Sequence, residues 1–229
     1  MVKYAVIMNV STELFKQVKT QALDNSIPCI SDSTGNFLEL LVRMNRSRKI
    51  IEIGTGNGYS TLFFLNSVFN RHVNENSYTQ CCENSTFDNE FKLFTFEKDK
   101  QRFDMAAANL KQFIDSGAVS LICDDALNHI SEVFSDGEAD FLFIDGTKRQ
   151  YTEALKQYWH KLKNGAIIFS DDVFFRGVLD PENALKRHKG IIEGLRGYNS
   201  FLDEFEKSGF IKNYFFQYEN GMSVSIKIK

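Results

Sequence analysis

Between Ile50 and Asp172, short apolar segments alternate with helix-like segments, and this alternation constrains the fold more than any other feature of the chain. The apolar segments are residues 50–53, 92–97, 119–123, 140–145 and 166–172. Strands separated by helices are typical of βαβ units, which build a parallel sheet. Two further strand-like segments, 211–219 and 222–229, flank Asn220–Gly221, a strong hairpin signal. The sequence therefore predicts an α/β protein with a doubly wound, mostly parallel sheet of seven strands, a C-terminal antiparallel hairpin and helices on both faces.

The segments between the strands predict the helices, and no change in composition divides the chain into domains. Helices are expected at residues 11–24, 33–44, 59–69, 99–114, 124–134, 149–162 and 191–207. We predict a single domain over residues 1–229, with N-terminal helices within residues 1–48. Residues 71–90 are polar, rich in asparagine and without periodicity, which predicts a loop insertion.

The bulk composition excludes several classes of protein. The formal net charge is −3, so no basic field favours nucleic acid or an anionic membrane. No run approaches the ~20 apolar residues of a membrane span, and the start of the chain lacks the small-residue cleavage site of a signal peptide. The four cysteines have no C-x-x-C spacing and are more typical of a reduced compartment. We expect a cytoplasmic protein.

The stretch Ile50–Ser60, IIEIGTGNGYS, predicts a strand that turns through glycines into a helix. Such a turn brings backbone N–H groups close to a ligand. The dinucleotide fingerprint is G-x-G-x-x-G, whereas here the third glycine, Gly58, comes one residue early. An ordinary glycine-rich turn would explain the glycines alone. The acid Glu52 within the strand and the E-x-G-x-G-x-G spacing favour a cofactor-binding turn instead.

Acids stand at the carboxyl ends of three predicted strands, at Glu97, at Asp145 and at the pair Asp171–Asp172. In an open parallel sheet, ligands bind outside these strand ends. A single acid in this place is often only a helix cap. Several acids at one edge would repel each other unless a positive group lay among them. A metal ion and a sulfonium cofactor are the two candidates for that group.

Two positions next to the strands are typical of nucleotide recognition. Glu97 ends the strand that follows the glycine turn, where an acid can bind both hydroxyls of a ribose. This role fits S-adenosylmethionine and NAD equally. Asp125 and Ala126 follow the next strand and could edge an adenine, although Asp125 could equally cap a helix there.

The metal candidates are Asp145, Asp171 and Asp172. Three carboxylates without a nearby histidine or cysteine favour a hard cation of the magnesium or calcium type over zinc. Lys148, three residues after Asp145, would lie near the mouth of this site. A neighbouring cation and partial burial would lower the pKa of Lys148 towards use as a general base. Taken alone, Lys148 would be a solvated lysine at a helix start.

These motifs together resemble the cation-dependent O-methyltransferases, which include the catechol and caffeoyl-CoA enzymes and small bacterial relatives. The resemblance runs from about Pro28 to the C-terminus and rests on TGNFLELL, IIEIGTGNGYS, FEKD, DFLFIDGTKRQY, GAIIFSDDVFFRG and ENGMSVSIKIK. The D-x-x-K-x-x-Y motif and the strand ending in two acids are more specific than the glycine turn. The resemblance implies a class I, Rossmann-like fold, S-adenosylmethionine as the cofactor, and Mg²⁺ or a similar divalent cation.

The resemblance also assigns roles to individual residues. The cofactor would lie on Ile30, Glu52, Gly54, Thr55, Gly56 and Ser60, with its ribose on Glu97 and further contacts to Asp125, Ala126 and Asp145. Asp145, Asp171 and Asp172 would bind the cation, Lys148 would be the catalytic base and Arg176 would contact substrate. The partner would be a small-molecule substrate, with no nucleic acid or membrane. A homodimer is compatible with the resemblance, although the sequence does not fix the oligomeric state.

The function predicted from these residues is methyl transfer to a hydroxyl of a small, catechol-like aromatic substrate. Asp172 departs from the family, in which the third metal ligand is usually asparagine. One alternative is a cofactor-binding protein of the same fold with lost or altered catalysis, which this departure and the insertion favour. A weaker alternative is a nucleotide-dependent oxidoreductase, which needs the G-x-G-x-x-G turn and gives Asp171 and Asp172 no role.

Overall fold

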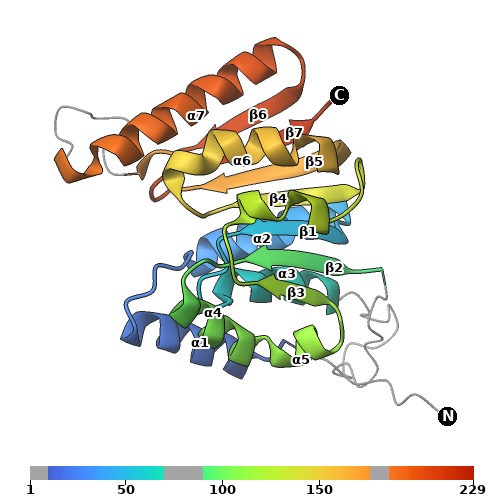
Figure 1. Ribbon diagram of the computed structural model, residues 1–229, viewed down its shortest axis with the longest axis vertical. Coiled ribbons are helices and arrows are strands. Elements are labelled where there is room, and N and C mark those ends of the chain that lie inside the picture. The colour runs from blue at the N-terminus through green and yellow to red at the C-terminus, as the bar shows by residue number, and fades with distance from the viewer. Residues whose placement is uncertain (1–9, 70–89, 176–185) are drawn as a thin grey trace. The chain divides into compact units, whose positions relative to one another are not determined.

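The computed structural model describes residues 10–69, 90–175 and 186–229 (Figure 1). Its helices are α1 (Thr12–Asp24), α2 (Asp32–Asn45), α3 (Tyr59–Phe69), α4 (Lys100–Asn109), α5 (Lys111–Asp115), α6 (Tyr151–Tyr158) and α7 (Lys189–Lys207). Its strands are β1 (Lys49–Ile53), β2 (Lys92–Phe96), β3 (Val119–Ile122), β4 (Ala139–Ile144), β5 (Leu162–Asp171), β6 (Ile211–Phe216) and β7 (Met222–Lys227). They form one mixed sheet of seven strands in the order β3-β2-β1-β4-β5-β7-β6. The predicted sheet with its C-terminal antiparallel hairpin is confirmed.

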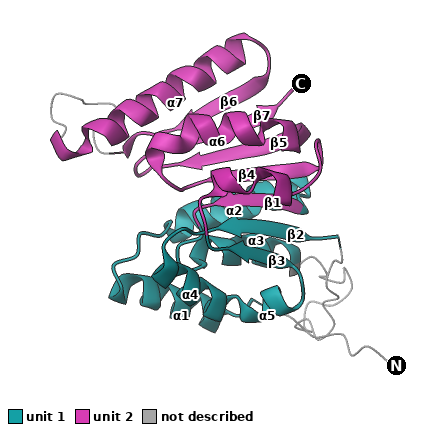
Figure 2. Ribbon diagram, in the orientation of Figure 1, with its two compact units in different colours: residues 1–48, 55–123 teal, residues 49–54, 124–229 magenta. Residues whose placement is uncertain are grey.

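The chain divides into two compact units (Figure 2). Unit 1 comprises residues 1–48 and 55–123, and unit 2 comprises residues 49–54 and 124–229. In unit 1, β2 and β3 pair in parallel, α1 and α2 pack on α3, and α4 and α5 contact β3. Two of these helices are capped by side chains at their starts: Ser11 accepts a hydrogen bond from Leu14 N at 3.1 Å, and Asp99 accepts one from Arg102 N at 3.0 Å.

In unit 2, β4 pairs in parallel with β1 and β5, whereas β7 pairs antiparallel with β5 and β6. All six residues of β4 are buried, as its continuous apolar sequence predicts for a strand covered on both faces. Helix α7 packs on α6 and β6. Tyr198 of α7 contacts the Tyr151 ring edge-to-face at 5.4 Å between centroids, and its hydroxyl bonds the Ser170 hydroxyl at 2.6 Å. These buried contacts fix the ends of β4 and β5, where the predicted acids lie.

Several predicted helices are wrong in extent. The helix expected at 99–114 breaks at Leu110 into α4 and α5, and the one expected at 149–162 is reduced to α6 with a short 3₁₀ turn on each side. As a result, β5 begins at Leu162 rather than at 166. The helix expected at 124–134 is replaced by two 3₁₀ turns, because Asp124 and Asp125 accept hydrogen bonds from the amides of Asp125 and Leu127 and so favour a turn.

Two predictions concern segments outside the described residues. Residues 71–89 of the predicted insertion and the predicted substrate residue Arg176 both lie there. Both stay predictions. Among the helices that the structure describes, none has the length and apolar character needed to cross a membrane.

Candidate functional site

The glycine turn and the predicted ribose acid lie together in unit 1. Gly56 N donates to Glu97 Oε2 at 2.9 Å, and Asp99 N donates to Glu97 Oε1 at 2.9 Å. Thr55 N also bonds the carbonyl of Phe96 at 3.1 Å, next to Glu97. The carboxylate of Glu97 is therefore buried and held by two backbone amides. The structure brings Gly56, a predicted contact of the methionine end, next to Glu97, the predicted ribose acid. Their roles in cofactor binding stay predictions.

Asn57, between two of the glycines, holds this turn to the helices of unit 1. Its Nδ2 donates to the carbonyl of Val18 at 2.8 Å and to Gln21 Oε1 at 3.1 Å. Asn109 Nδ2 donates in turn to the carbonyl of Asn57 at 2.9 Å and to Gln21 Oε1 at 2.7 Å. The sequence analysis missed these three side chains, because only their place in the fold makes them neighbours.

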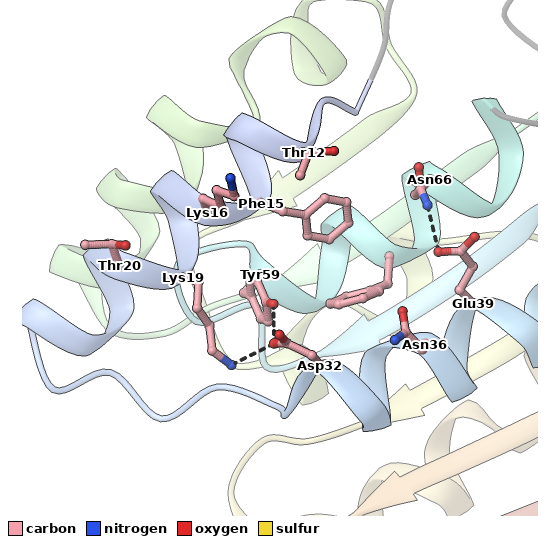
Figure 3. Close-up of a pocket in the computed structure, with 11 residues that line it drawn as sticks. Thr12, Phe15, Lys16, Lys19, Thr20, Asp32, Asn36, Glu39, Tyr59 and Asn66 are labelled. Carbon is pink, nitrogen blue, oxygen red and sulfur yellow. Dashed lines mark hydrogen bonds and ion pairs between the residues drawn. The ribbon is translucent and has the colours of Figure 1, made fainter. Parts of the chain in front are cut away.

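The loop that carries Ile30 is fixed by a second polar cluster (Figure 3). Lys19 Nζ donates to the carbonyl of Ile30 at 3.1 Å and lies 3.3 Å from Asp32 Oδ1. Tyr59, the first residue of α3, donates from its hydroxyl to the same Asp32 oxygen at 2.7 Å. This hydrogen bond is the main reason that the pKa of Asp32 is lowered, and burial with the nearby carboxylate raises the pKa of Tyr59. We name Lys19, Asp32 and Tyr59 the loop clamp.

A cavity of about 470 Å³ opens beside the loop clamp, between α1, α2 and α3 (Figure 3). Phe15, Tyr59 and Phe63 form an aromatic group in its wall, with ring centroids 4.8–6.1 Å apart. None of the predicted cofactor, metal or catalytic residues lines this cavity. It is therefore not the predicted reaction site.

In unit 2, the end of β1 approaches the end of β4 closely. Gly54 has φ +101°, and a Cβ on it would lie 2.5 Å from the carbonyl oxygen of Asp145. Asp145 N donates to the carbonyl of Ile53 at 2.9 Å. Only glycine allows this backbone and this approach. Glu52, which precedes Gly54 by two residues, is completely buried within β1.

The predicted metal and catalytic residues of unit 2 form one cluster. Lys148 Nζ lies 2.7 Å from Asp145 Oδ1 and 3.0 Å from Asp172 Oδ2. It also donates to the hydroxyl of Tyr151 at 2.8 Å, and that hydroxyl donates to the carbonyl of Asp171 at 3.0 Å. The D-x-x-K-x-x-Y motif thus joins the ends of β4 and β5 through one ammonium and one phenol.

The electrostatics of this cluster follow from burial and from three neighbouring carboxylates. Burial, with the charges of Asp145 and Asp172, raises the pKa of Asp171 to about 8. Burial likewise raises the pKa of Asp145. Burial by itself would lower the pKa of Lys148, but the charges of Asp145 and Asp172 raise it well above the ordinary value. The pairing with two carboxylates is the cause of this rise. The lowered pKa expected from sequence assumed a neighbouring cation, and it stays a prediction.

The donors of this cluster match a hard cation in chemistry but not in their present arrangement. The carboxylates of Asp145 and Asp172 contact a single ammonium, and the carboxylate of Asp171 interacts with the same charges, which favours a further cation. Within the described ranges, however, no set of three or more His, Cys, Asp or Glu side chains is arranged to hold a metal ion. Lys148 lies between two of the required ligands, so a cation would have to displace its ammonium.

Asp125 and Ala126, the predicted adenine contacts, lie at a 3₁₀ turn of unit 2. Asp125 Oδ1 accepts from Leu127 N at 3.1 Å and its Oδ2 accepts from Gln150 Nε2 at 3.0 Å. The carbonyl of buried Ala126 accepts from the hydroxyl of Tyr158 at 2.6 Å. The capping role left open for Asp125 is thus observed.

Helix α7 supports the turn that carries Lys148. A Cβ on Gly194 would lie 2.9 Å from Arg149 Cα and 3.3 Å from the carbonyl oxygen of Lys148. The helix backbone can come this close only because the position lacks a side chain. The sequence gives no sign of this support, since Gly194 lies within a predicted helix far along the chain.

Comparison with known protein families identifies methyltransferases as relatives of this chain. A family profile described as a methyltransferase domain matches residues 51–173, and a second, described as O-methyltransferase, matches residues 7–69. A catechol O-methyltransferase of Niastella koreensis is 25% identical over 175 residues, which cover 76% of this chain and 69% of the relative.

Solved structures show the same fold. An O-methyltransferase from Bacillus cereus, in complex with SAH, has a TM-score of 0.74 at 19% identity, covering 95% of this chain and 91% of that one. TomG from Streptomyces achromogenes, an O-methyltransferase of tomaymycin synthesis in complex with SAM, has a TM-score of 0.75 at 20% identity, covering 96% and 91%. The chain belongs to the methyltransferase family, among the class I S-adenosylmethionine-dependent O-methyltransferases that include the catechol and caffeoyl-CoA enzymes.

Proposed function

We propose that this O-methyltransferase methylates a hydroxyl of a small aromatic vicinal diol, using S-adenosylmethionine and a divalent cation held by Asp145, Asp171 and Asp172. The observation that carries the proposal is the ammonium of Lys148, which lies within 3.0 Å of two of these carboxylates. The relative named a catechol O-methyltransferase supports the substrate class. The similar O-methyltransferases solved in complex with SAH or SAM support the cofactor.

Unit 1 would bind the nucleoside part of the cofactor. The carboxylate of Glu97 would accept hydrogen bonds from the ribose hydroxyls while Gly56 N keeps it in place. Thr55, Gly56 and Ser60 would line the methionine end together with Ile30, whose loop the clamp holds. The resemblance also assigns cofactor contacts to Glu52 and Gly54 on β1 and to Asp125, Ala126 and Asp145, all of which belong to unit 2. Gly54 contributes by leaving space where its backbone meets that of Asp145.

Unit 2 would orient the acceptor and take up its proton. When bound, the divalent cation supplies Lewis acidity towards a hydroxyl, and S-adenosylmethionine supplies an electrophilic methyl group. Lys148 would leave the carboxylates and, once released from them, accept the hydroxyl proton at Nζ. Tyr151 would keep that nitrogen near the ends of β4 and β5 through its hydroxyl. The main task of these residues is to hold the reacting groups in line, which can lower the barrier by roughly 7–11 kcal/mol.

The test is a methyl-transfer assay with purified protein, S-adenosylmethionine, Mg²⁺ and a panel of catechols. We expect activity that EDTA abolishes and added Mg²⁺ restores. Asp145→Ala should lose at least about a hundredfold in activity, together with its response to Mg²⁺. Asp115→Ala, which removes an exposed acid that pairs with Lys111, should behave as wild type. Full activity after EDTA treatment would contradict the metal part of the proposal.

A second candidate is a protein that binds the cofactor without catalysing transfer. The observation in its favour is the pairing of Asp172 with Lys148, which keeps the proposed base protonated. Binding of S-adenosylhomocysteine in a calorimeter, with no transfer to any catechol at any Mg²⁺ concentration, would support it over the enzyme.

Three predictions from the sequence accompany this proposal. Arg176 would contact the substrate, the protein would work in the cytoplasm, and a homodimer would be compatible with its family. Light scattering on the purified protein would measure the oligomeric state directly.

A further inference from the structure

The turn between β6 and β7 is bonded to the segment that follows β5. Val173 N donates to the carbonyl of Gly221 at 2.9 Å, and Phe174 N donates to the carbonyl of Asn220 at 2.7 Å. Asn220 Nδ2 donates to Asp172 Oδ1 at 3.0 Å. Three hydrogen bonds thus join two segments that lie 48 residues apart in sequence, and they all lie next to one carboxylate.

The close approach of these segments depends on Gly221. Its φ is +80°, and a Cβ there would lie 2.2 Å from the ring of Phe174. The same ring packs on Phe215 of β6 at 5.5 Å between centroids. The C-terminal hairpin therefore packs directly on the two residues that follow Asp172.

Asp172 itself has an unusual backbone. Its φ of +58° lies in the left-handed region, which few residues other than glycine adopt, although aspartate and asparagine tolerate it better than most. The hydrogen bonds of Val173 and Phe174 hold the chain in this conformation. It points the carboxylate so that Oδ1 meets Asn220 and Oδ2 lies 3.0 Å from Lys148 Nζ.

We propose that Asn220 is a positioning residue that orients the carboxylate of Asp172 for the divalent cation, so that the C-terminal hairpin forms part of the cation site. This inference rests on the proposed function. The amide nitrogen can only donate, so it fixes Oδ1 and leaves Oδ2 directed towards the cluster. Without it, the carboxylate keeps its ion pair with Lys148, but either oxygen can then face the ammonium. Partners of this kind, outside the ligands themselves, change metal affinity by about 10–100-fold.

The test measures cation binding without turnover. Mn²⁺ is titrated into the full-length protein and free Mn²⁺ is followed by electron paramagnetic resonance, while affinity for S-adenosylhomocysteine is measured by calorimetry. Asn220→Ala should bind Mn²⁺ about tenfold more weakly, with unchanged affinity for S-adenosylhomocysteine. Asn220→Gln, which keeps an amide donor on a flexible side chain, should recover most of the Mn²⁺ affinity.

The matched control is Asn45→Ala, since Asn45 also donates one side-chain hydrogen bond, to Ser47 Oγ at 2.9 Å. It should leave Mn²⁺ affinity unchanged. Wild-type affinity for Mn²⁺ in Asn220→Ala would overturn the proposal, as would equal weakening of Mn²⁺ and S-adenosylhomocysteine binding, which indicates general misfolding. If the wild-type protein binds S-adenosylhomocysteine but no Mn²⁺, the metal part of the proposed function fails as well, and the wild-type titration alone shows this.

Discussion

The carboxyl group of Asp171 combines burial with two negative neighbours, and these effects raise its pKa to about 8. Asp145 lies in the same cluster and its pKa is raised by burial as well. Because the two groups interact, the cluster takes up protons as a unit. Lys148 compensates part of the charge through its contacts with Asp145 and Asp172. The carboxylates of this cluster therefore repel one another, and binding of either a proton or a cation would lower that repulsion.

This repulsion predicts how stability depends on pH. An unfolded aspartate has a pKa of about 3.9, so between that value and about 8 the folded protein binds more protons than the unfolded chain. The free energy of unfolding contributed by Asp171 therefore falls as the pH rises through this window. In EDTA, Asp171→Asn should lose less thermal stability than wild type on going from acidic to alkaline buffer. Calorimetric melts of both proteins across that range would check this, and parallel pH profiles would contradict it.

Side chains from three helices hold the loop that precedes α2 and carries Ile30, one of the proposed cofactor contacts. Helix α3 starts with Tyr59, α2 starts with Asp32, and α1 supplies Lys19; these three form the loop clamp around Ile30 (Figure 3). The Nζ of Lys19 also lies 4.5 Å from the centroid of the Tyr59 ring. The order of the loop before α2 therefore depends on a hydrogen bond made by the helix that follows the glycine turn.

We predict that Tyr59→Phe weakens cofactor binding without unfolding the protein. The change removes only the hydroxyl that donates to Asp32 at 2.7 Å. A hydrogen bond to a charged group contributes roughly 1.5–3 kcal/mol, of which part should appear as lower affinity for S-adenosylhomocysteine because the Ile30 loop is less ordered. Calorimetric titration should show an affinity several-fold lower. Tyr214→Phe, on a half-exposed tyrosine of β6, is the control and should bind as wild type.

At the scale of the whole molecule, the chain passes between the two units three times, after residues 48, 54 and 123. β1 belongs to unit 2, although α2 and α3 on either side of it in sequence belong to unit 1. A unit interrupted in this way cannot be excised as one continuous piece. The single domain over residues 1–229 stays a prediction from the sequence.

Single-domain behaviour predicts one cooperative unfolding transition. The only tryptophan of the chain is Trp159, which packs on Phe205 in unit 2 at 4.7 Å between ring centroids. Its fluorescence reports on unit 2, whereas far-ultraviolet circular dichroism reports on the helices of both units. The two signals should change at the same urea concentration. A fluorescence midpoint clearly separated from the circular dichroism midpoint would show that the units unfold independently.

The helices and strands of this protein could be predicted well where a short stretch of neighbouring residues decides the backbone conformation. The strands ending at Ile53, Phe96 and Ile144 and the caps at Ser11 and Asp99 follow from short patterns of apolar and polar residues. The same patterns failed at residues 124–134, where side chains of two aspartates compete with the helix for backbone amides. Local preference could not decide between these outcomes, since both use the same residues.

The sequence by itself determined the family and the order of the strands along the chain, and it supplied the candidate residues for the chemistry, whose roles stay predictions. Only the tertiary structure decided their partners: Tyr59 with Asp32 across 27 residues, and Asn220 with Asp172 across 48. It also decided that Lys148 pairs with two carboxylates, whose charges raise its pKa. The physical reason is that pattern and propensity act over a few neighbouring residues, whereas hydrogen bonds, burial and charge interactions depend on distance in space.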